Sequence, residues 1–255
     1  MATTRRITTV TLDWGDTLAA NHGMPYLVTQ RRAFERLGQD LAALGCTVVP
    51  TDFAEKAMTD LSGDWRRSID PVLNPEHKEF DFAAMLGGWI AAVGGMDCDQ
   101  HQVRQVLSRC TARLADTVIP YGDSAPALSM LKARGYRIGI LSHTPWPGDA
   151  CREWFHRHGM AAYIDFYSLS CEVGWIKPHP RHFQHALDQA GETPDRVLHV
   201  GDHPVRDIEG ARAQGMRTCL RVTENIYSQD ALARCRPDAE ILHLRELLDV
   251  LDRLG

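Results

Sequence analysis

The stretch ITTVTLDWGDTL, residues 7–18, contains a run of β-branched and aliphatic residues that ends abruptly at a carboxylate. Thr, Val and Ile favour extended backbone, so residues 7–13 are predicted to form a buried strand that releases the chain at Asp13. A second carboxylate, Asp16, follows three residues later. The pattern DxxDT is also a common turn composition. Whether the two carboxylates form a reactive pair or a polar turn therefore depends on what the rest of the chain brings to them.

Short apolar runs and amphipathic stretches alternate from about residue 120 onward. Strands are predicted at 7–13, 136–142, 196–202 and 217–222, with weaker candidates at 164–169 and 241–244. Apolar spacing of three and four residues predicts helices over 125–134, 181–190, 205–214 and 245–254. This alternation predicts an α/β fold with a doubly wound parallel sheet. Ligands bind such sheets at the carboxyl ends of the strands.

The segment 19–118 interrupts this alternation and has the pattern of helices throughout. The clearest helical spacing lies over 25–45, 82–93 and 103–114. A helical insertion directly after the first strand is best explained as a second domain. We therefore expect a core made of residues 1–18 and 119–255, and an all-helical cap domain made of residues 19–118.

Composition argues against several classes of function. The chain has 255 residues, and its 28 basic and 33 acidic side chains give a net charge of -5, whereas nucleic-acid-binding domains are usually strongly basic. The longest uncharged run, residues 83–96, is too short to span a membrane. The first residues lack the apolar segment of a secretory signal. We expect a cytoplasmic protein without nucleic-acid or membrane partners, and the sequence indicates no oligomeric state.

Polar side chains follow the predicted strands in turn. They are Asp13 and Asp16, then Ser142, then Lys177 in GWIKPHPRHF, then Asp202 and Asp207 in HVGDHPVRDIEGARAQGM. Carboxylates that converge at one sheet edge repel one another and need a cation, and oxygen ligands suit Mg²⁺. A magnesium ion, a lysine and a serine hydroxyl can together hold a phosphoryl group. A carboxylate can then act as nucleophile and form an aspartyl-phosphate.

Each motif alone also has an ordinary structural interpretation. Ser142 can cap a turn, and Lys177 before a proline can be a plain loop residue. Asp202 before a helix start is a good cap. Four such motifs at the ends of alternating strands, in this order, favour a single shared site that acts on a small phosphorylated metabolite.

These motifs resemble those of the haloacid dehalogenase-like (HAD) superfamily, in the form with a helical cap inserted after the first motif. The resemblance covers essentially the whole core, and the chain looks most like a phosphatase-like subgroup whose first motif runs DxxDTL. It implies a Rossmann-like core and a Mg²⁺-dependent phosphatase whose cap closes over the site and selects the substrate. The implied roles are Asp13 as nucleophile and metal ligand, the Gly15 carbonyl as a further ligand, Ser142 with the adjoining His143 at the phosphoryl oxygens, Lys177 steadying the charge, and Asp202 with Asp207 holding metal and lysine.

One position departs from the pattern of these phosphatases. They are expected to carry a second Asp two residues after the nucleophile as general acid and base, and this chain has Gly15 there. Such proton transfer typically contributes about 10² to 10⁴ in rate. Asp16 can replace it if Gly15 lets the backbone swing. A histidine next to a motif can replace it, with His22, His143 and His203 as candidates. Alternatively, the substrate has a stable leaving group, and the chain is a slow or specialised phosphatase.

The same departure supports rival functions. L-2-haloacid dehalogenases of the superfamily lack the second Asp and attack carbon without magnesium, but the intact GDxxxxD motif fits a metal enzyme better. Phosphonoacetaldehyde hydrolases share an opening similar to Asp13, Trp14 and Gly15 and use a cap lysine. The only lysines of the predicted cap, Lys56 and Lys78, do not resemble that lysine motif. A catalytically weak HAD-fold binding protein is a further alternative, against which the retention of all four motifs argues.

Two histidines outside the motifs share one helix face. His182 and His185 lie three residues apart in the predicted helix 181–190. Such a pair can bind a metal ion, but we expect an exposed helix face.

Overall fold

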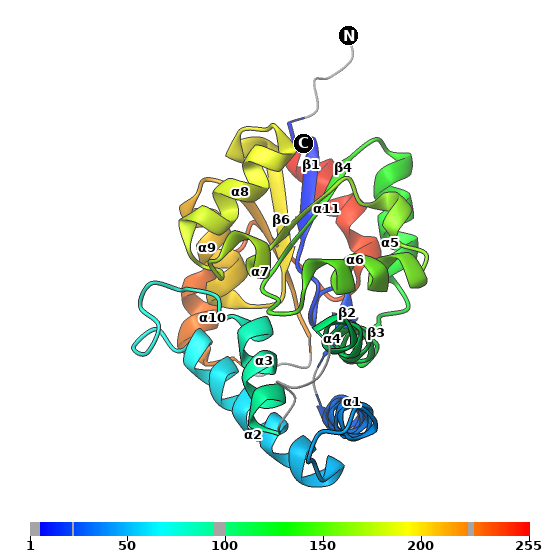
Figure 1. The fold of residues 1–255 in the computed structure, drawn as a ribbon. Helices are drawn as coiled ribbons and strands as arrows, with labels where there is room; N and C mark the ends of the chain where they lie inside the picture. The colour runs from blue at the N-terminus through cyan, green and yellow to red at the C-terminus, as the bar shows by residue number, and fades with distance from the viewer. Residues whose placement is uncertain (1–5, 22, 94–99, 224–226) are drawn as a thin grey trace. The chain divides into compact units, whose positions relative to one another are not determined.

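A computed structural model describes residues 6–21, 23–93, 100–223 and 227–255 (Figure 1). The chain divides into two compact units. The core unit comprises residues 1–20, 120–144 and 155–255, and the helical unit comprises residues 21–119 and 145–154. We describe each unit by itself. The domain boundaries at residues 19 and 118 stay a prediction.

A six-stranded sheet with the order β5-β4-β1-β6-β7-β8 forms the centre of the core unit. Its strands are β1 (Thr9–Leu12), β4 (Arg137–Ser142), β5 (Phe166–Leu169), β6 (Val197–Gly201), β7 (Arg217–Arg221) and β8 (Ala239–Ile241). Each neighbouring pair is parallel. The prediction of an α/β fold with a parallel sheet is therefore confirmed.

Helices cover both faces of this sheet, as a doubly wound fold requires. In Figure 1, α8 (Pro180–Ala190) and α9 (Gly210–Ala213) lie on one face, and α5 (Ser124–Ala133) and α11 (Leu247–Leu254) lie on the other. Further helical elements are α6 (Gly148–Arg157), most of which belongs to the helical unit, α7 (Ser170–Val173), α10 (Gln229–Cys235), and the 3-10 turns η2 (Ala161–Tyr163), η3 (Pro194–Arg196) and η5 (Leu244–Glu246). Because both faces are covered, the strands are near-continuous apolar runs, which is why the sequence indicated them.

The strand register brings the ends of the three central strands to one edge. Leu12 of β1 lies opposite Ile140 of β4 and Val200 of β6. The residues just beyond these positions therefore leave the sheet side by side. Asp13, Ser142 and Asp202 come from these three strand ends.

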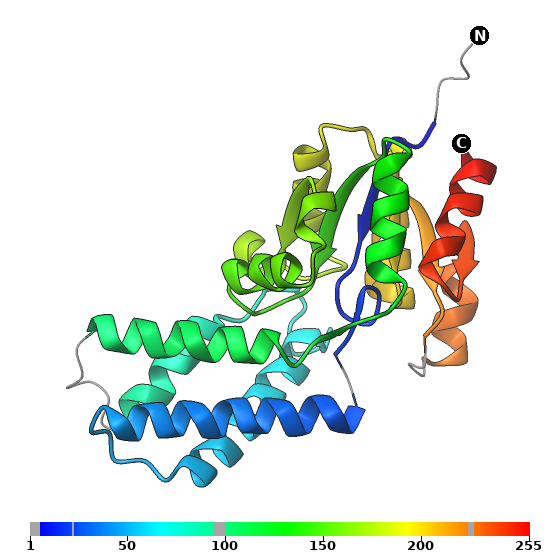
Figure 2. The same ribbon diagram turned by 90° about the vertical axis from the view of Figure 1, so that its right-hand side faces the viewer.

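The main helices of the helical unit are α1 (Gly23–Ala43), α2 (Pro50–Ile69), α3 (Phe82–Ala92) and α4 (Gln100–Ala115). Figure 2 shows α1 beside α4, and α1 also packs on α2. Trp89 anchors the interior, because its ring meets Phe34 and Phe53 edge-on at 5.6 and 6.3 Å between ring centroids. Its indole N–H donates to Asp60 Oδ2 over 2.9 Å. The helices expected over 25–45, 82–93 and 103–114 are confirmed.

Three details differ from the prediction. The expected helix 205–214 is a π-helical turn, η4 (Pro204–Glu209), that continues into α9. The wider turn of a π-helix is seen in the hydrogen bond that the Ile208 N–H donates to His203 O, five residues earlier, over 3.3 Å. The last strand ends earlier than expected, at Ile241. Two short strands, β2 (Ala19–Ala20) and β3 (Ile119–Pro120), pair in a separate sheet.

The exposed face expected for His182 and His185 is wrong. His182 is fully buried, and its Nε2 lies 3.1 Å from Ser168 O. His185 is half-buried, with Nδ1 2.9 Å from Ser168 Oγ. Burial lowers the pKa of His182 well below its usual range, so this ring is neutral and structural.

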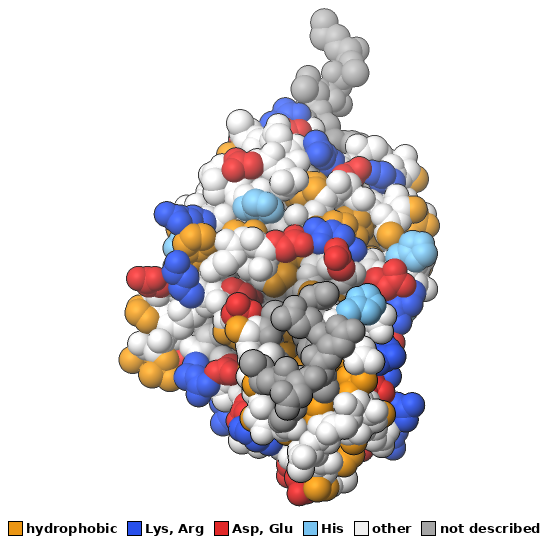
Figure 3. Space-filling model, viewed as in Figure 1, with side chains coloured by type: hydrophobic (Ala, Val, Ile, Leu, Met, Phe, Trp, Pro, Cys, Tyr) orange, Lys and Arg blue, Asp and Glu red, His pale blue; other side chains and the backbone are white. Residues whose placement is uncertain are grey.

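The surface carries charges of both signs. Basic and acidic side chains are interspersed over the face shown in Figure 3, as expected for a net charge of -5 on 255 residues. Among the residues that the structure describes, no helix is both long enough and apolar enough to cross a membrane.

Gly139 offers a test of the sheet packing. It lies opposite Phe166 in the β4–β5 register, and a Cβ at this position would lie 2.2 Å from the Phe166 ring. Gly139→Ala is expected to lower the free energy of unfolding by about 1–3 kcal/mol through overpacking, measured by urea denaturation. The control Gly122→Ala has no atom within 4 Å of the new methyl group and should change stability by less than about 0.5 kcal/mol. Equal losses in the two variants would contradict the packing.

Candidate active site

Three carboxylates meet at the carboxyl edge of the sheet. Asp13 follows β1, Asp202 follows β6 and Asp207 lies in η4, and each offers an oxygen within 4.8 Å of the others. The Asp13 N–H donates to Val200 O over 2.9 Å and so extends the β1–β6 pairing by one residue. Asp202 and Asp207 are buried, whereas the Asp13 side chain is 13% exposed. Asp13 is therefore the carboxylate of this cluster that a molecule in solvent can reach most easily.

Lys177 is buried in the middle of this cluster. Its Nζ lies 2.9 Å from Asp13 Oδ1 and 2.5 Å from Asp207 Oδ1, and it donates to Leu141 O over 3.0 Å. Burial alone would lower the pKa of Lys177, but the two carboxylates outweigh that effect and raise it. The lysine is therefore charged at neutral pH, although its side chain is only 2% exposed.

Asp207 is engaged by the protein at both oxygens. Oδ1 lies 3.3 Å from His199 Nε2 in addition to its contact with Lys177, and Oδ2 accepts the His203 N–H over 2.9 Å. Burial would raise the pKa of this carboxyl group, but Lys177 and His199 hold it well below its usual range. Gly201 makes this position possible, because a Cβ there would lie 2.3 Å from Asp207 Cγ.

His199 was not identified from the sequence. It is fully buried in β6, and its Nδ1 lies 3.0 Å from Thr11 Oγ1 in β1. The ring also meets Phe183 edge-on at 5.9 Å. It thus connects the first strand to Asp207. A signal for it existed, because a histidine inside a run predicted to be a buried strand needs polar partners.

The residues after Asp13 form a tight turn. The Leu18 and Ala19 N–H groups both donate to Trp14 O, and the Asp16 N–H donates to Ala19 O over 2.6 Å. Asp16 has φ 56°, the left-handed region that Asp tolerates better than most residues. We expected Gly15 to supply this backbone freedom, but the turn places it at Asp16. In an extended chain, successive side chains point to opposite sides, and Asp16 would point away from Asp13; the left-handed backbone at Asp16 breaks that alternation.

Arg221 fixes this turn from behind. It stands at the end of β7, is buried, and donates to Thr17 O. Its guanidinium also lies 3.2 Å from Asp123 Oδ1 and 4.4 Å from the Tyr121 ring centroid. This contact could not be predicted from the sequence, because it joins residues that lie more than 200 positions apart.

Ser142 and His143 lie at the end of β4, the strand beside β1. Ser142 is buried and His143 is half-buried. The loop that follows is fixed by Ser170, whose Oγ accepts the Thr144 N–H over 2.8 Å and donates to Thr144 O over 3.1 Å. The two predicted phosphate-binding residues therefore come from the strand end next to that of Asp13.

The sequence also indicates His22 and His203 as candidate proton carriers, because each lies next to a motif. His22 lies outside the described residues. His203 caps η4, because its Nδ1 accepts the Val205 and Arg206 N–H groups, each over 3.2 Å. Burial and the Arg206 guanidinium lower the pKa of His203 to about 3. His203 is therefore neutral at pH 7 and unsuited to act as a general acid.

The donor set of this cluster fits a hard divalent cation. Three carboxylates face one lysine, so negative charge is in excess, and the oxygen donors suit Mg²⁺ better than a metal that prefers sulfur or nitrogen. Since both oxygens of Asp207 already accept contacts from the protein, Asp13 and Asp202 are the better candidates for direct ligands.

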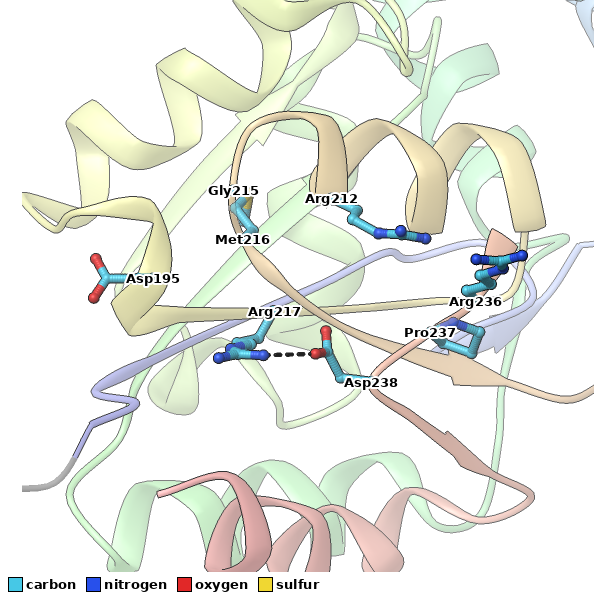
Figure 4. Close-up of a pocket in the computed structure, with 8 residues that line it drawn as sticks. All are labelled: Asp195, Arg212, Gly215, Met216, Arg217, Arg236, Pro237 and Asp238. Carbon is cyan, nitrogen blue, oxygen red and sulfur yellow. Dashed lines mark hydrogen bonds and ion pairs between the residues drawn. The ribbon is translucent and has the colours of Figure 1, made fainter. Parts of the chain in front are cut away.

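A pocket lies at the amino ends of the strands, opposite the carboxylate cluster. It has a volume of about 410 Å³ and is lined by residues that precede or begin β6, β7 and β8, among them Asp195, Arg217 and Asp238 (Figure 4). Arg217 Nη1 lies 2.8 Å from Asp238 Oδ1 within it. None of the catalytic candidates lines it, so we place the active site at the carboxylate cluster.

The parallel sheet, with carboxylates, a lysine and a serine at its carboxyl edge, has the fold and the site residues expected of a phosphoryl-directed hydrolase. The family model for the haloacid dehalogenase-like hydrolases matches residues 7–215, and the chain belongs to this family.

The chain is similar to several characterised members. It is 35% identical over 141 residues to glyceraldehyde 3-phosphate phosphatase of Methanopyrus kandleri, covering 53% of this chain and 58% of that protein. It is 30% identical over 168 residues to N-acetylmuramic acid 6-phosphate phosphatase of Pseudomonas aeruginosa, covering 64% and 73%. The crystal structure of 2-haloacid dehalogenase from Pseudomonas syringae pv. Tomato DC3000 is 26% identical, with a TM-score of 0.68 and coverage of 98% and 100%. The chain spans about half the length of several curated relatives that it matches.

Replacing Lys177 tests the charge balance of the cluster. Lys177→Met leaves Asp13 and Asp207 without their cation, so we expect a loss of about 3–5 kcal/mol in unfolding free energy at pH 7. The folded-state pKa of Asp207 is depressed, so its contribution exists above the unfolded value near 4 and is lost as pH falls below it. The variant should therefore lose less stability than the wild type as the pH falls below about 4, measured by urea denaturation.

The matched control is Lys132→Met. Lys132 pairs with Asp165 at 2.5 Å, but both side chains are partly exposed, at 36% and 28%. This change should cost no more than about 1 kcal/mol. Parallel pH profiles for Lys177→Met and the wild type would rule out the proposed coupling.

Proposed function

We propose that this chain is a Mg²⁺-dependent phosphatase that hydrolyses a small phosphorylated metabolite through an aspartyl-phosphate on Asp13. The observation that carries the proposal is the accessible Asp13 carboxylate, held beside the buried ammonium of Lys177 and close to Asp202. The phosphatase names of several curated relatives support the reaction class. Cytoplasmic location and the absence of nucleic-acid and membrane partners remain predictions from composition.

Asp13 is suited to be the nucleophile. Lys177 lies 2.9 Å from its Oδ1, so the ammonium holds a positive charge beside the carboxylate that attacks phosphorus. In the first step a bond forms between a carboxylate oxygen and phosphorus, and the bond from phosphorus to the leaving oxygen breaks. In the second step water attacks phosphorus, and Asp13 leaves as a carboxylate with inorganic phosphate as the product.

The remaining groups stabilise charge on the phosphoryl oxygens. Lys177 supplies a fixed positive charge, and Ser142 comes from the neighbouring strand end with a hydroxyl donor. Mg²⁺, when bound by Asp13, Asp202 and the Gly15 carbonyl, supplies further neutralisation of that charge. Asp207 keeps the ammonium of Lys177 in place. Preorganised charge of this kind is the main source of catalysis in phosphoryl transfer.

Asp16 is our candidate for the proton carrier. The turn that follows Asp13 gives Asp16 a left-handed backbone. The Asp16 carboxylate is therefore not forced to point away from Asp13, as it would be in an extended chain. His143 is the remaining candidate among the described residues that the sequence nominated. We also propose that residues 19–118 are the cap domain that selects the substrate.

A second function has specific support. Gly15 stands at the position where these phosphatases are expected to carry the general acid. The similar structure from Pseudomonas syringae is a 2-haloacid dehalogenase. In that reaction Asp13 would attack carbon and displace a halide without a metal ion. The excess negative charge of the carboxylate cluster favours the metal-dependent phosphatase instead.

The first experiment distinguishes these two reactions. The wild type should release phosphate from members of a phosphate ester panel, and excess chelator should abolish that release until Mg²⁺ is restored. Asp13→Asn, which keeps the side-chain shape, should lose at least about 10³-fold in turnover. The variant should still unfold in one cooperative transition, although the loss of the ion pair with Lys177 lowers its midpoint. Undiminished hydrolysis by this variant would refute the nucleophile, and chelator-insensitive chloride release from 2-chloropropionate would favour dehalogenation.

The second experiment addresses the proton. If Asp16 protonates the leaving group, Asp16→Asn should slow hydrolysis of alkyl phosphates by about 10²- to 10⁴-fold. The loss should be much smaller for p-nitrophenyl phosphate, whose leaving group needs little protonation. His143→Ala is the comparison and should slow the two substrates by similar factors. The reverse pattern would assign the proton to His143.

A further inference from the structure

Tyr227 reaches the carboxylate cluster from outside the four motifs. It precedes α10 in the connection that follows β7, and its hydroxyl donates a hydrogen bond to Asp202 Oδ2. Asp202 is only 5% exposed and Tyr227 is half-buried, so the contact is partly buried. Neither the strand pattern nor the motifs of the sequence pointed to this residue.

The tyrosine ring is held from the side by His203. The two ring centroids lie 4.9 Å apart with an interplanar angle of 58°. His203 is itself fixed, because its Nδ1 accepts two backbone N–H groups and its own N–H donates to Asp207 Oδ2. The Tyr227 hydroxyl therefore approaches Asp202 from a supported ring, which restricts the directions that the hydrogen bond can take.

We propose that Tyr227 is a positioning residue for the metal site, acting through Asp202. A hydrogen bond to one carboxylate oxygen restricts rotation of the group and so sets the direction of the other oxygen. It also offsets part of the mutual repulsion in a cluster of three carboxylates and one lysine. Partners of this kind typically contribute about 10- to 100-fold to metal affinity. The inference rests on the metal site of the proposed function.

The test measures Mg²⁺ affinity directly. Isothermal titration of the full chain with MgCl₂ should give a dissociation constant about 10- to 100-fold higher for Tyr227→Phe than for the wild type. Without Mg²⁺ the variant should still unfold cooperatively, and its loss in unfolding free energy should not exceed that expected for one hydrogen bond to a charged group. Tyr163→Phe is the matched control, because it removes a half-buried tyrosine hydroxyl in η2, away from the motifs, and it should leave the affinity unchanged.

A double-mutant cycle separates positioning from a general structural effect. Asp202→Asn removes the carboxylate that Tyr227 contacts, so adding Tyr227→Phe to this variant should change Mg²⁺ affinity by less than twofold. Equal affinity of Tyr227→Phe and the wild type overturns the inference. Tighter Mg²⁺ binding by Tyr227→Phe also overturns it, since the hydroxyl would then occupy space that the cation needs. Lack of Mg²⁺ binding by the wild type overturns it as well.

These outcomes are independent of the phosphatase assay. A wild type that binds Mg²⁺ more tightly than Tyr227→Phe but hydrolyses no phosphate ester retains the positioning role and loses the proposed function. A wild type that hydrolyses phosphate esters with Mg²⁺, but whose Mg²⁺ affinity is unaffected by Tyr227→Phe, retains the function and loses the positioning role.

Discussion

The buried ammonium of Lys177 is the interaction on which the rest of the site depends. Removing an ammonium group from water costs several kcal/mol unless it is paired and hydrogen-bonded. Lys177 meets this requirement with Asp13 after β1, Asp207 in η4 and the Leu141 carbonyl in β4. These groups come from separate segments, so the lysine can be charged and buried only when the sheet edge is assembled. The same requirement that stabilises the fold therefore aligns the reacting groups.

This arrangement divides the work among the carboxylates. Asp207 is satisfied by Lys177, His199 and a backbone N–H, and Gly201 leaves the room for it against β6. Its role is to hold the ammonium in place. In the proposed function, Asp13 and Asp202 remain for the metal and the substrate. A lysine alone cannot neutralise three carboxylates, so a divalent cation bound there would balance the remaining negative charge.

The sequence predicted the sheet and the residues at its edge because both depend on local patterns. Buried parallel strands are continuous apolar runs, and parallel topology brings the residues that follow them together. His199 was missed because it was counted as a strand residue, although its burial required a partner. Tyr227 and Arg221 could not be predicted, since their contacts depend on how distant segments pack. The π-helical form of η4 was likewise invisible, because its residues have the spacing of an ordinary helix.

The turn after Asp13 shows where conformational preference and chemistry diverge. A left-handed residue is most easily glycine, and the cost for other residues is about 1 kcal/mol. The chain has a glycine in this turn, but at position 15, and the left-handed backbone falls on Asp16. The conformational free energy of the backbone alone would favour glycine at position 16. Residues held in less favourable conformations cluster at functional sites, so the carboxylate at this position supports the proposal that the Asp16 side chain takes part in the chemistry.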